Sequence, residues 1–349
     1  MFDKMARSLA DTGHYDLHII GFPSRNPCEY PGIQFHPSSR FARISLRRIL
    51  RPFAICWKVW SLKPALFIIT THELLAIGAL LRWLTGARLV YDVRENYFRN
   101  IRYLTSFPRL LRVPIAWYVR IKEVLFAATV KLFVLSDAGY QDELSFIKRN
   151  YLVVENKVRA DLFNPPRKDE RHTMNLLFSG TLAPSTGIFQ AIELATRLHQ
   201  VDASVRLTII GYCSLPATSK KILDLIRDKV FIQLKGGDQL VPHSEIVEAI
   251  GLADFGIIAY PANPSIVNTI PTKLYEYLAA QLPILMVDHK PWRELCDRYQ
   301  AAIIFSLEDI DPQALLQKMM TQHFYETAPG ENLYWEGEFK KLVTRLEAL

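Results

Sequence analysis

The residues best suited to chemistry lie in one segment, Asn268 to Ile284. Pro271 suits the first turn of a helix, because the N–H that proline lacks has no partner there. The free N–H groups and the positive dipole end of such a helix attract a phosphate, and Lys273 adds a full charge. Glu276 follows as an acceptor for ribose hydroxyls. The segment predicts a pyrophosphate and ribose site, although the pattern alone also fits an amphipathic helix with two solvated charges.

A second group of polar residues follows apolar runs in the first half of the chain. Asp92, Arg94 and Glu95 come directly after the run that begins at Arg88, and His72 follows another run. A carboxylate here can act as a general base that takes the proton of a hydroxyl group, and we expect Glu95 to do so. Arg94 is a permanent cation and cannot be a general base. For His72, a capping or partly buried structural role remains the alternative to an acceptor-side role.

Short β-branched runs alternate with longer amphipathic stretches along the whole chain, which is the pattern of parallel sheets flanked by helices. Such a scaffold would position the residues named above. A polar segment with two prolines, residues 164–171, separates two sets of runs. We therefore predict an α/β fold with two tandem doubly wound domains, residues 1–163 and 172–330, facing across a cleft at the carboxyl ends of the strands. The expected strands are 16–21, 65–70, 88–92, 131–135, 151–154, 174–179, 205–211, 230–234, 255–260, 283–287 and 302–305.

The first residues of the chain have helical spacing, with Phe2, Met5, Ala6 and Leu9 on one face, and no strand is expected before them. The first strand of a doubly wound sheet is central. We therefore expect a gap in the middle of the first sheet, as if one strand of this domain were missing. An upstream extension that supplies a strand is expected to fill it.

The charge is unevenly distributed, and the first half is strongly basic. Residues 1–160 carry 24 Lys and Arg against 12 Asp and Glu, whereas residues 161–349 carry 18 against 23. The stretch 40–63 has seven cations and no acid among aromatic and aliphatic residues. This composition predicts a helix on an anionic membrane surface, with a solvated helix face as the alternative. The residues expected at the membrane are Arg43, Arg47, Arg48, Arg51 and Trp57.

The remaining composition narrows the class of protein. The four cysteines form no CxxC pair, so neither a zinc site nor a disulfide framework is indicated, and a reducing, cytoplasmic location fits. No apolar stretch is long enough to span a bilayer. No nucleic-acid-binding module accompanies the basic half, so we expect no nucleic-acid partner. The predicted location is the inner face of the plasma membrane, as a peripheral protein.

The segment Thr-x-Pro-x-Lys-Leu-Tyr-Glu-Tyr-Leu-Ala-Ala-x-Leu-Pro-Ile resembles the donor-site motif of the large retaining glycosyltransferase family 4, of the two-domain B fold (GT-B). Three further segments resemble that family and follow one another in the family's order. They are residues 2–13, 91–96 and 178–182. The resemblance implies a nucleotide-sugar donor as substrate, retention at the anomeric carbon, no cofactor and no essential metal. It also implies that the last helix, within 331–349, returns to the first domain. The donor-binding residues it implies are Gly180, Thr181, Asn268, Thr269, Thr272, Lys273 and Glu276.

The sequence departs from the family pattern at several positions. Asn268 stands eight residues before Glu276, where many members have an acid, but its amide can still bond sugar hydroxyls. Thr181 and Thr186 stand where many members have an arginine and a lysine for the diphosphate. Lys273 must then carry more of that charge.

These observations together predict an enzyme of the glycosyltransferase class (EC 2.4). It is expected to transfer a sugar to a membrane-associated, lipid-linked or cell-surface polysaccharide acceptor of the cell envelope. A nucleotide-sugar epimerase is one alternative, although the basic acceptor half argues against it. A scaffold protein that kept the fold and lost catalysis is the other alternative.

Overall fold

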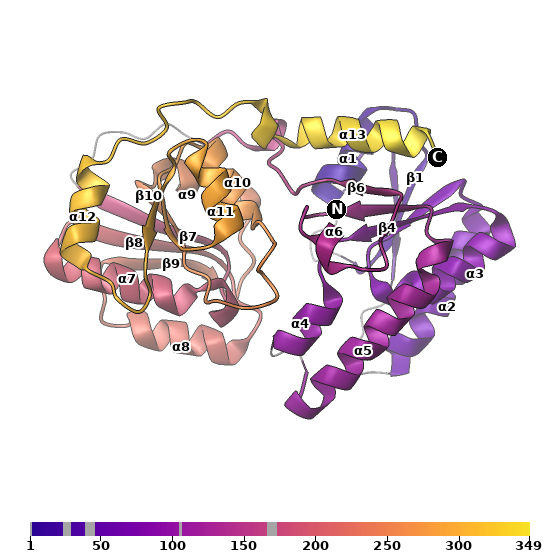
Figure 1. The fold of residues 1–349 in the computed structure, drawn as a ribbon, viewed down its shortest axis with the longest axis horizontal. Coiled ribbons are helices and arrows are strands. Elements are labelled where there is room, and N and C mark those ends of the chain that lie inside the picture. Colours follow the sequence, from indigo (N-terminus) through magenta and orange to yellow (C-terminus); the bar gives the residue numbers. More distant parts are fainter. Residues whose placement is uncertain (1, 24–28, 39–45, 105–106, 166–172) are drawn as a thin grey trace. The chain divides into compact units, whose positions relative to one another are not determined.

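The computed structural model describes residues 2–23, 29–38, 46–104, 107–165 and 173–349, with side chains from residue 4 and, in α2, from Leu50. The chain divides into two compact units, Met1–Asn156 with Trp335–Leu349, and Lys157–Tyr334 (Figure 1). Residues 157–163 belong to the second unit because Val158 and Phe163 pack in its core beside Leu177. Most of the polar segment 164–171 lies outside the described residues.

The second unit is built on a parallel sheet of six strands in the order β12-β11-β10-β7-β8-β9. The order reverses beside β7, which is where a doubly wound sheet changes direction and where ligands bind. The strands are β7 (Met174–Thr181), β8 (Val205–Tyr212), β9 (Ile232–Gly237), β10 (Phe255–Ile258), β11 (Ile284–Val287) and β12 (Ala302–Phe305).

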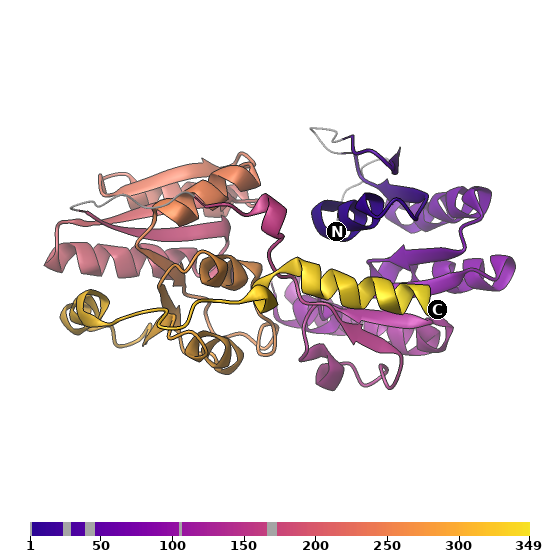
Figure 2. The ribbon, with the colours of Figure 1, turned by 90° about the horizontal axis from the view of Figure 1, so that it is seen from above.

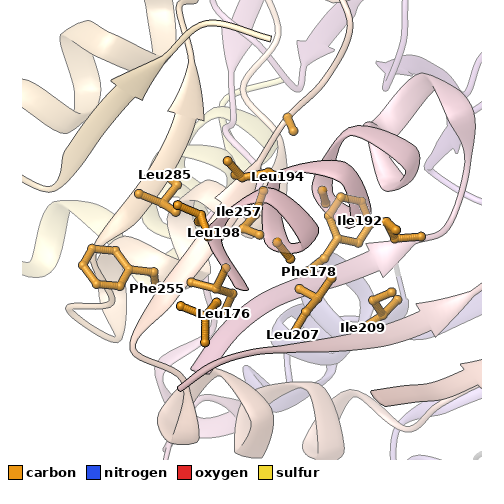
Figure 3. Close-up of a cluster of buried hydrophobic side chains, with 14 of the residues drawn as sticks. Leu176, Phe178, Ile192, Leu194, Leu198, Leu207, Ile209, Phe255, Ile257 and Leu285 are labelled. Carbon is orange, nitrogen blue, oxygen red and sulfur yellow. The ribbon is translucent and has the colours of Figure 1, made fainter. Parts of the chain in front are cut away.

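Helices cover both faces of this sheet, because successive residues of the buried strands point to opposite sides. Leu176 and Phe178 of β7 pack beside Leu194 and Leu198 of α7 on one face (Figure 3), in a cluster that also includes Leu315 of α12. Leu177 packs against α9, α10 and α11 on the other face. The helices are α7 (Ile188–Val201), α8 (Pro216–Ile226), α9 (His243–Leu252), α10 (Thr272–Ala279), α11 (Lys290–Asp297) and α12 (Pro312–Thr321), with short turns η4 (Ala160–Leu162), η5 (Pro184–Thr186) and η6 (Glu331–Leu333).

A row of glycines crosses the carboxyl edge of this sheet, where Gly180, Gly211 and Gly236 pair with one another in register. A Cβ atom on Gly211 would lie 1.7 Å from the carbonyl oxygen of Gly180, so the two strand ends approach more closely than any side chain allows. This edge therefore presents backbone rather than side chains to a ligand.

Gly211→Ala is expected to lower the free energy of unfolding by about 3 kcal/mol, because backbone atoms must move to admit the methyl group. Urea denaturation, monitored by circular dichroism, measures this loss of free energy of unfolding. Gly237→Ala on the neighbouring strand is the control, because this glycine also has a positive φ, +73°, but its nearest atom is a leucine methyl at 3.6 Å. Equal losses in the two variants would show that close approach at Gly211 is not what requires glycine there.

In the described part of the first unit, six strands form two separate parallel sheets. One sheet pairs β1 (Leu17–Gly21) with β2 (Ile33–Pro37), and the other runs β3-β4-β5-β6. Leu17 of β1 and Leu66 of β3 pack against the same buried cluster, yet no ladder joins these two strands. The strands of the second sheet are β3 (Leu66–Ile69), β4 (Arg88–Val93), β5 (Leu132–Leu135) and β6 (Tyr151–Val153).

Two layers of helices cover the four-stranded sheet. Tyr91 faces α3, α5 and α6, whereas Val90 faces α1 and α13. Figure 2 shows α13 in yellow beside these strands, and Trp335 at its start donates a hydrogen bond to Ser8 at 2.9 Å. The helices are α1 (Arg7–Asp11), α2 (Leu46–Leu62), α3 (Leu75–Thr85), α4 (Tyr97–Tyr103), α5 (Arg109–Phe126), α6 (Tyr140–Glu143) and α13 (Trp335–Glu347), with turns η1 (Phe2–Ala6), η2 (His72–Leu74) and η3 (Ala127–Thr129).

Candidate functional site

Lys273 is the centre of the candidate donor site in the second unit. It lies in the first turn of α10, which begins after Pro271. Its side chain is 93% buried, with Nζ 4.2 Å from the ring centroid of Phe178 and 5.3 Å from that of Tyr260. A Cβ on Gly180 would lie 3.7 Å from its Cε. The ammonium group is therefore held by two aromatic faces at the glycine edge of β7.

The Lys273 ammonium group is out of water without a conventional partner. Among the residues that the structure describes, none hydrogen-bonds Nζ. Burial lowers the pKa of Lys273 to about 7, and the charge of Glu276 opposes this change. A buried amine that meets only ring faces is costly to charge. An anion placed beside Gly180 would restore the charged form.

Glu276 lies one turn further along α10 and is also almost fully buried. Its Oε1 is 2.8 Å from Nε2 of His243, the first residue of α9. Strand β9 ends at the same sheet edge as β7, and α9 follows it, so these side chains meet there. His243 was not among the residues predicted from the sequence. The available signal was a polar residue directly after Pro242 at the start of an amphipathic run.

The loop after β7 carries hydroxyls instead of cations. The Thr186 hydroxyl donates to the carbonyl oxygen of Thr181 at 2.7 Å and accepts from the N–H of Ala183 at 3.2 Å. Thr181 itself is exposed at the end of β7. The loop then turns at Gly187, where a Cβ would lie 1.9 Å from the carbonyl of Ala259. Thr186 therefore fixes the conformation of this loop and adds no charge to the candidate donor site. The cationic side chain of that site is Lys273.

The segment before α10 holds the remaining residues expected at the donor site. The Thr269 carbonyl accepts a hydrogen bond from the Trp292 indole at 2.6 Å, and its N–H donates to Ile266 at 3.0 Å. Asn268 is half-buried beside it, and Thr272 is the first residue of α10. Thr269 therefore fixes the approach to the helix start, next to Lys273.

In the first unit, the expected acceptor-side residues meet at the carboxyl end of β4. Asp92 is buried, and Nε of Arg94 donates to its Oδ2 at 2.8 Å. Burial raises the pKa of Asp92, and the Arg94 charge opposes the change. Glu95 is exposed and accepts a hydrogen bond from Asn100. Asp92 is thus held in an ion pair, and Glu95 is the carboxylate open to solvent.

His72 joins this group because β3 and β4 are neighbours and end at the same edge. Its ring stands edge-on to Tyr97, the first residue of α4, at a centroid distance of 4.7 Å. Asn96, which follows Glu95, is buried, and it was not predicted from the sequence. Its Oδ1 accepts from the N–H of Arg99 and from Arg120, and its Nδ2 donates to Glu143 at 2.7 Å. Asn96 therefore caps α4 and fixes the turn that presents Glu95.

A pocket of about 330 Å³ lies beside the ends of β1 and β2 and was not foreseen either. Arg51 and Lys58 of α2 line it together with His36 and Ser38, and Nε of Arg51 donates to the Ser38 hydroxyl at 2.7 Å. Burial, and then the charges of Lys58 and His18, lower the pKa of His36. Arg51 therefore faces this pocket, whereas Trp57 is exposed. Arg43 lies outside the described residues, as do the side chains of Arg47 and Arg48.

Within the described ranges, no three His, Cys, Asp or Glu side chains gather as they would around a metal ion. Metal-independent activity stays a prediction. No helix among the described residues is long and apolar enough to cross a bilayer.

Comparison with known proteins rests on structure alone. No family model and no curated protein sequence matches the chain. Sucrose-phosphate synthase from Thermosynechococcus elongatus superposes with a TM-score of 0.73 over 98% of this chain and 92% of that chain, at 12% identity. HepE from Anabaena, in complex with UDP and glucose, gives 0.63 over 91% and 87%, at 14% identity. A trehalose-phosphate synthase from Burkholderia vietnamiensis gives 0.59 over 89% and 81%, at 11% identity.

The chain has the GT-B fold. The predicted fold class, two Rossmann-like α/β domains, is thereby confirmed. In this GT-B chain, Gly180, Lys273 and Glu276 lie at one edge of the second unit, where β7 ends and α10 begins. Asp92, Arg94, Glu95 and His72 lie at the ends of β3 and β4 in the first unit.

Proposed function

We propose that this protein is a glycosyltransferase that moves a sugar from a nucleoside-diphosphate sugar to a hydroxyl of an acceptor. The single observation that carries the proposal is the buried Lys273 ammonium group at the glycine edge of β7, one helical turn from Glu276. An enclosed cation of this kind can bind a diphosphate. A carboxylate one helical turn further along α10 can accept hydrogen bonds from ribose hydroxyls. HepE, which shares the fold, was crystallised with UDP and with UDP-glucose, which supports a nucleotide-sugar donor.

In the proposed reaction, the bond between the anomeric carbon and the diphosphate breaks, and the nucleoside diphosphate leaves with the electron pair. The acceptor oxygen forms the new bond to that carbon and releases its proton. Lys273 neutralises the charge that develops on the leaving phosphate, and Glu95 receives the proton. Retention at the anomeric carbon follows the resemblance of the donor motif and is proposed with it.

We further propose that the acceptor is a lipid-linked or cell-surface glycan at an anionic membrane, to which the enzyme attaches peripherally. The basic first half of the chain supports this. The reaction is tested by incubating the protein with UDP-, GDP- and ADP-sugars, with and without membrane lipid extract. Release of nucleoside diphosphate that requires the extract is the expected result. Interconversion of the sugar without any acceptor would instead identify an epimerase, and failure to bind any nucleoside diphosphate would favour a scaffold protein.

Glu276→Gln is expected to weaken nucleotide-sugar binding about 30-fold, because two charge-assisted hydrogen bonds to ribose hydroxyls become neutral ones. Isothermal titration calorimetry with the donor measures this. Glu248→Gln, an exposed change on α9, is the matched control and should bind as the wild type does. Unchanged affinity in a folded Glu276→Gln protein would remove Glu276 from the donor site.

A further inference from the structure

Helix α5 in the first unit leaves an apolar stripe in solvent. Its inner face packs through Ala116 and Val119, whereas Leu110, Trp117 and Leu125 on the outside are 91%, 51% and 69% exposed. The outer residues recur at helical spacing, so they form one stripe rather than scattered positions. A soluble helix face normally carries charge at such positions.

Two neighbouring helices repeat the pattern. On α3, Trp83 is 80% exposed, with Leu80 and Leu84 beside it in the sequence. On α2, Phe53 and Trp57 belong to an exposed series at spacings of three and four. Helix α3 contacts both α2 and α5, and the three lie together in Figures 1 and 2. The three stripes therefore belong to one region of the first unit.

The charge that these helices expose to solvent is positive. Helix α2 carries four Lys and Arg residues, α3 carries one and α5 carries four. The one acid in the three helices is Glu123, which is buried. A second copy of the chain would bring the same positive charge to this face and be repelled. A bilayer with acidic head groups instead offers phosphates to the cations and an apolar boundary to the tryptophans, which favour such interfaces.

We infer that α2, α3 and α5 form a membrane-docking surface on which Trp83, Leu110, Trp117 and Leu125 enter the boundary between head groups and acyl chains of an anionic bilayer. The apolar side chains insert, and exposed cations of these helices such as Arg109 contact lipid phosphates. This surface deepens the acceptor part of the proposed function, which it would serve by holding the first unit at a lipid-linked acceptor.

The test is flotation with vesicles of phosphatidylcholine containing phosphatidylglycerol. Wild type should float with them at low salt. A triple variant, Trp83→Ser, Leu110→Ser and Leu125→Ser, should bind at least about tenfold more weakly, since three exposed apolar side chains are lost. The matched control changes Val230, Leu240 and Met320 to serine, which are similarly exposed residues of the second unit, and should bind as wild type does.

Tryptophan fluorescence reports insertion directly. Trp83, Trp117 and Trp57 are exposed, whereas Trp292 and Trp335 are buried. Emission should therefore shift to shorter wavelength on vesicle binding and be quenched by lipids brominated in the acyl chain. Salt-sensitive binding without quenching would overturn the inference in favour of purely electrostatic contact.

Two other results would also overturn it. One is equal flotation of the triple variant and its control. The other is a concentration-dependent dimer of the wild type, abolished in the triple variant, with no flotation of either, which would make a second copy the occupant. Nucleoside diphosphate affinity, measured by calorimetry, should be the same in all three proteins. Vesicle binding and donor binding can therefore fail separately.

Discussion

Lys273→Met should lower turnover by about 1000-fold and weaken nucleoside diphosphate binding by about 10- to 100-fold. Among the residues that the structure describes, the variant removes the one buried cation at the glycine edge of β7, where the loop from Thr181 to Gly187 carries no Lys or Arg. A charge-assisted contact accounts for the binding loss. The larger effect on turnover reflects the charge that grows on the leaving phosphate. Calorimetry and steady-state kinetics separate the two effects.

The low pKa of Lys273, about 7, should make binding of a nucleoside diphosphate at this group depend on pH. Above pH 7 the free protein holds this amine largely neutral, and a bound diphosphate returns it to the charged form. Binding at pH 8.5 should therefore take up about one proton, and affinity should fall about tenfold per pH unit between 7.5 and 9.5. Calorimetry in two buffers of different ionisation enthalpy measures the uptake. Equal uptake by wild type and Lys273→Met would assign the proton to another group.

The same amine affects the stability of the free protein in the opposite direction. Its ordinary pKa of 10.5 applies in the unfolded chain, which therefore binds more protons than the folded chain between pH 7 and 10.5. The contribution of Lys273 to the free energy of unfolding thus rises with pH across that window. Lys273→Met should be more stable than wild type at pH 6, by a few kcal/mol, and the difference should shrink by pH 10.

Glu95→Gln should lower the maximal rate about 100-fold or more and leave nucleoside diphosphate affinity unchanged. A general base contributes on this scale, and an amide cannot take the acceptor proton. Glu95 is exposed, whereas Asp92 is occupied by its ion pair with Arg94. Asp142→Asn, an exposed change on α6, is the control and should retain full activity. A fully active Glu95→Gln protein would contradict the assignment and leave proton acceptance to the leaving phosphate.

Local composition was enough to predict most of the elements, because buried parallel strands are dense in β-branched and apolar residues. Strand β2 was missed, since its sequence Ile-Gln-Phe-His-Pro mixes polar residues with a proline. The proline is tolerated because, within the described residues, β2 pairs with β1 alone and lies at an edge of its sheet.

Five of the seven expected donor residues were named from the sequence because they occupy one continuous segment around the start of α10, from Asn268 to Glu276. His243 and Asn96 were not, because each acquires its role from a partner far along the chain, Glu276 in one case and Glu143 in the other. The orientation of α2 was also beyond the sequence. Its cations and aromatics are interleaved, and only packing decides that Arg51 and Lys58 line a pocket while Trp57 faces solvent.

The separation of β1 from β3 has a consequence for the lifetime of the protein in concentrated solution. Within the described residues, each of these strands has one edge whose N–H and C=O groups pair with no other strand. Such edges recruit extended segments of other molecules. Amides on these edges should exchange with deuterium much faster than those of β4 and β5, and strand-to-strand aggregation should start there. Peptides or additives that shield these two edges should slow this aggregation.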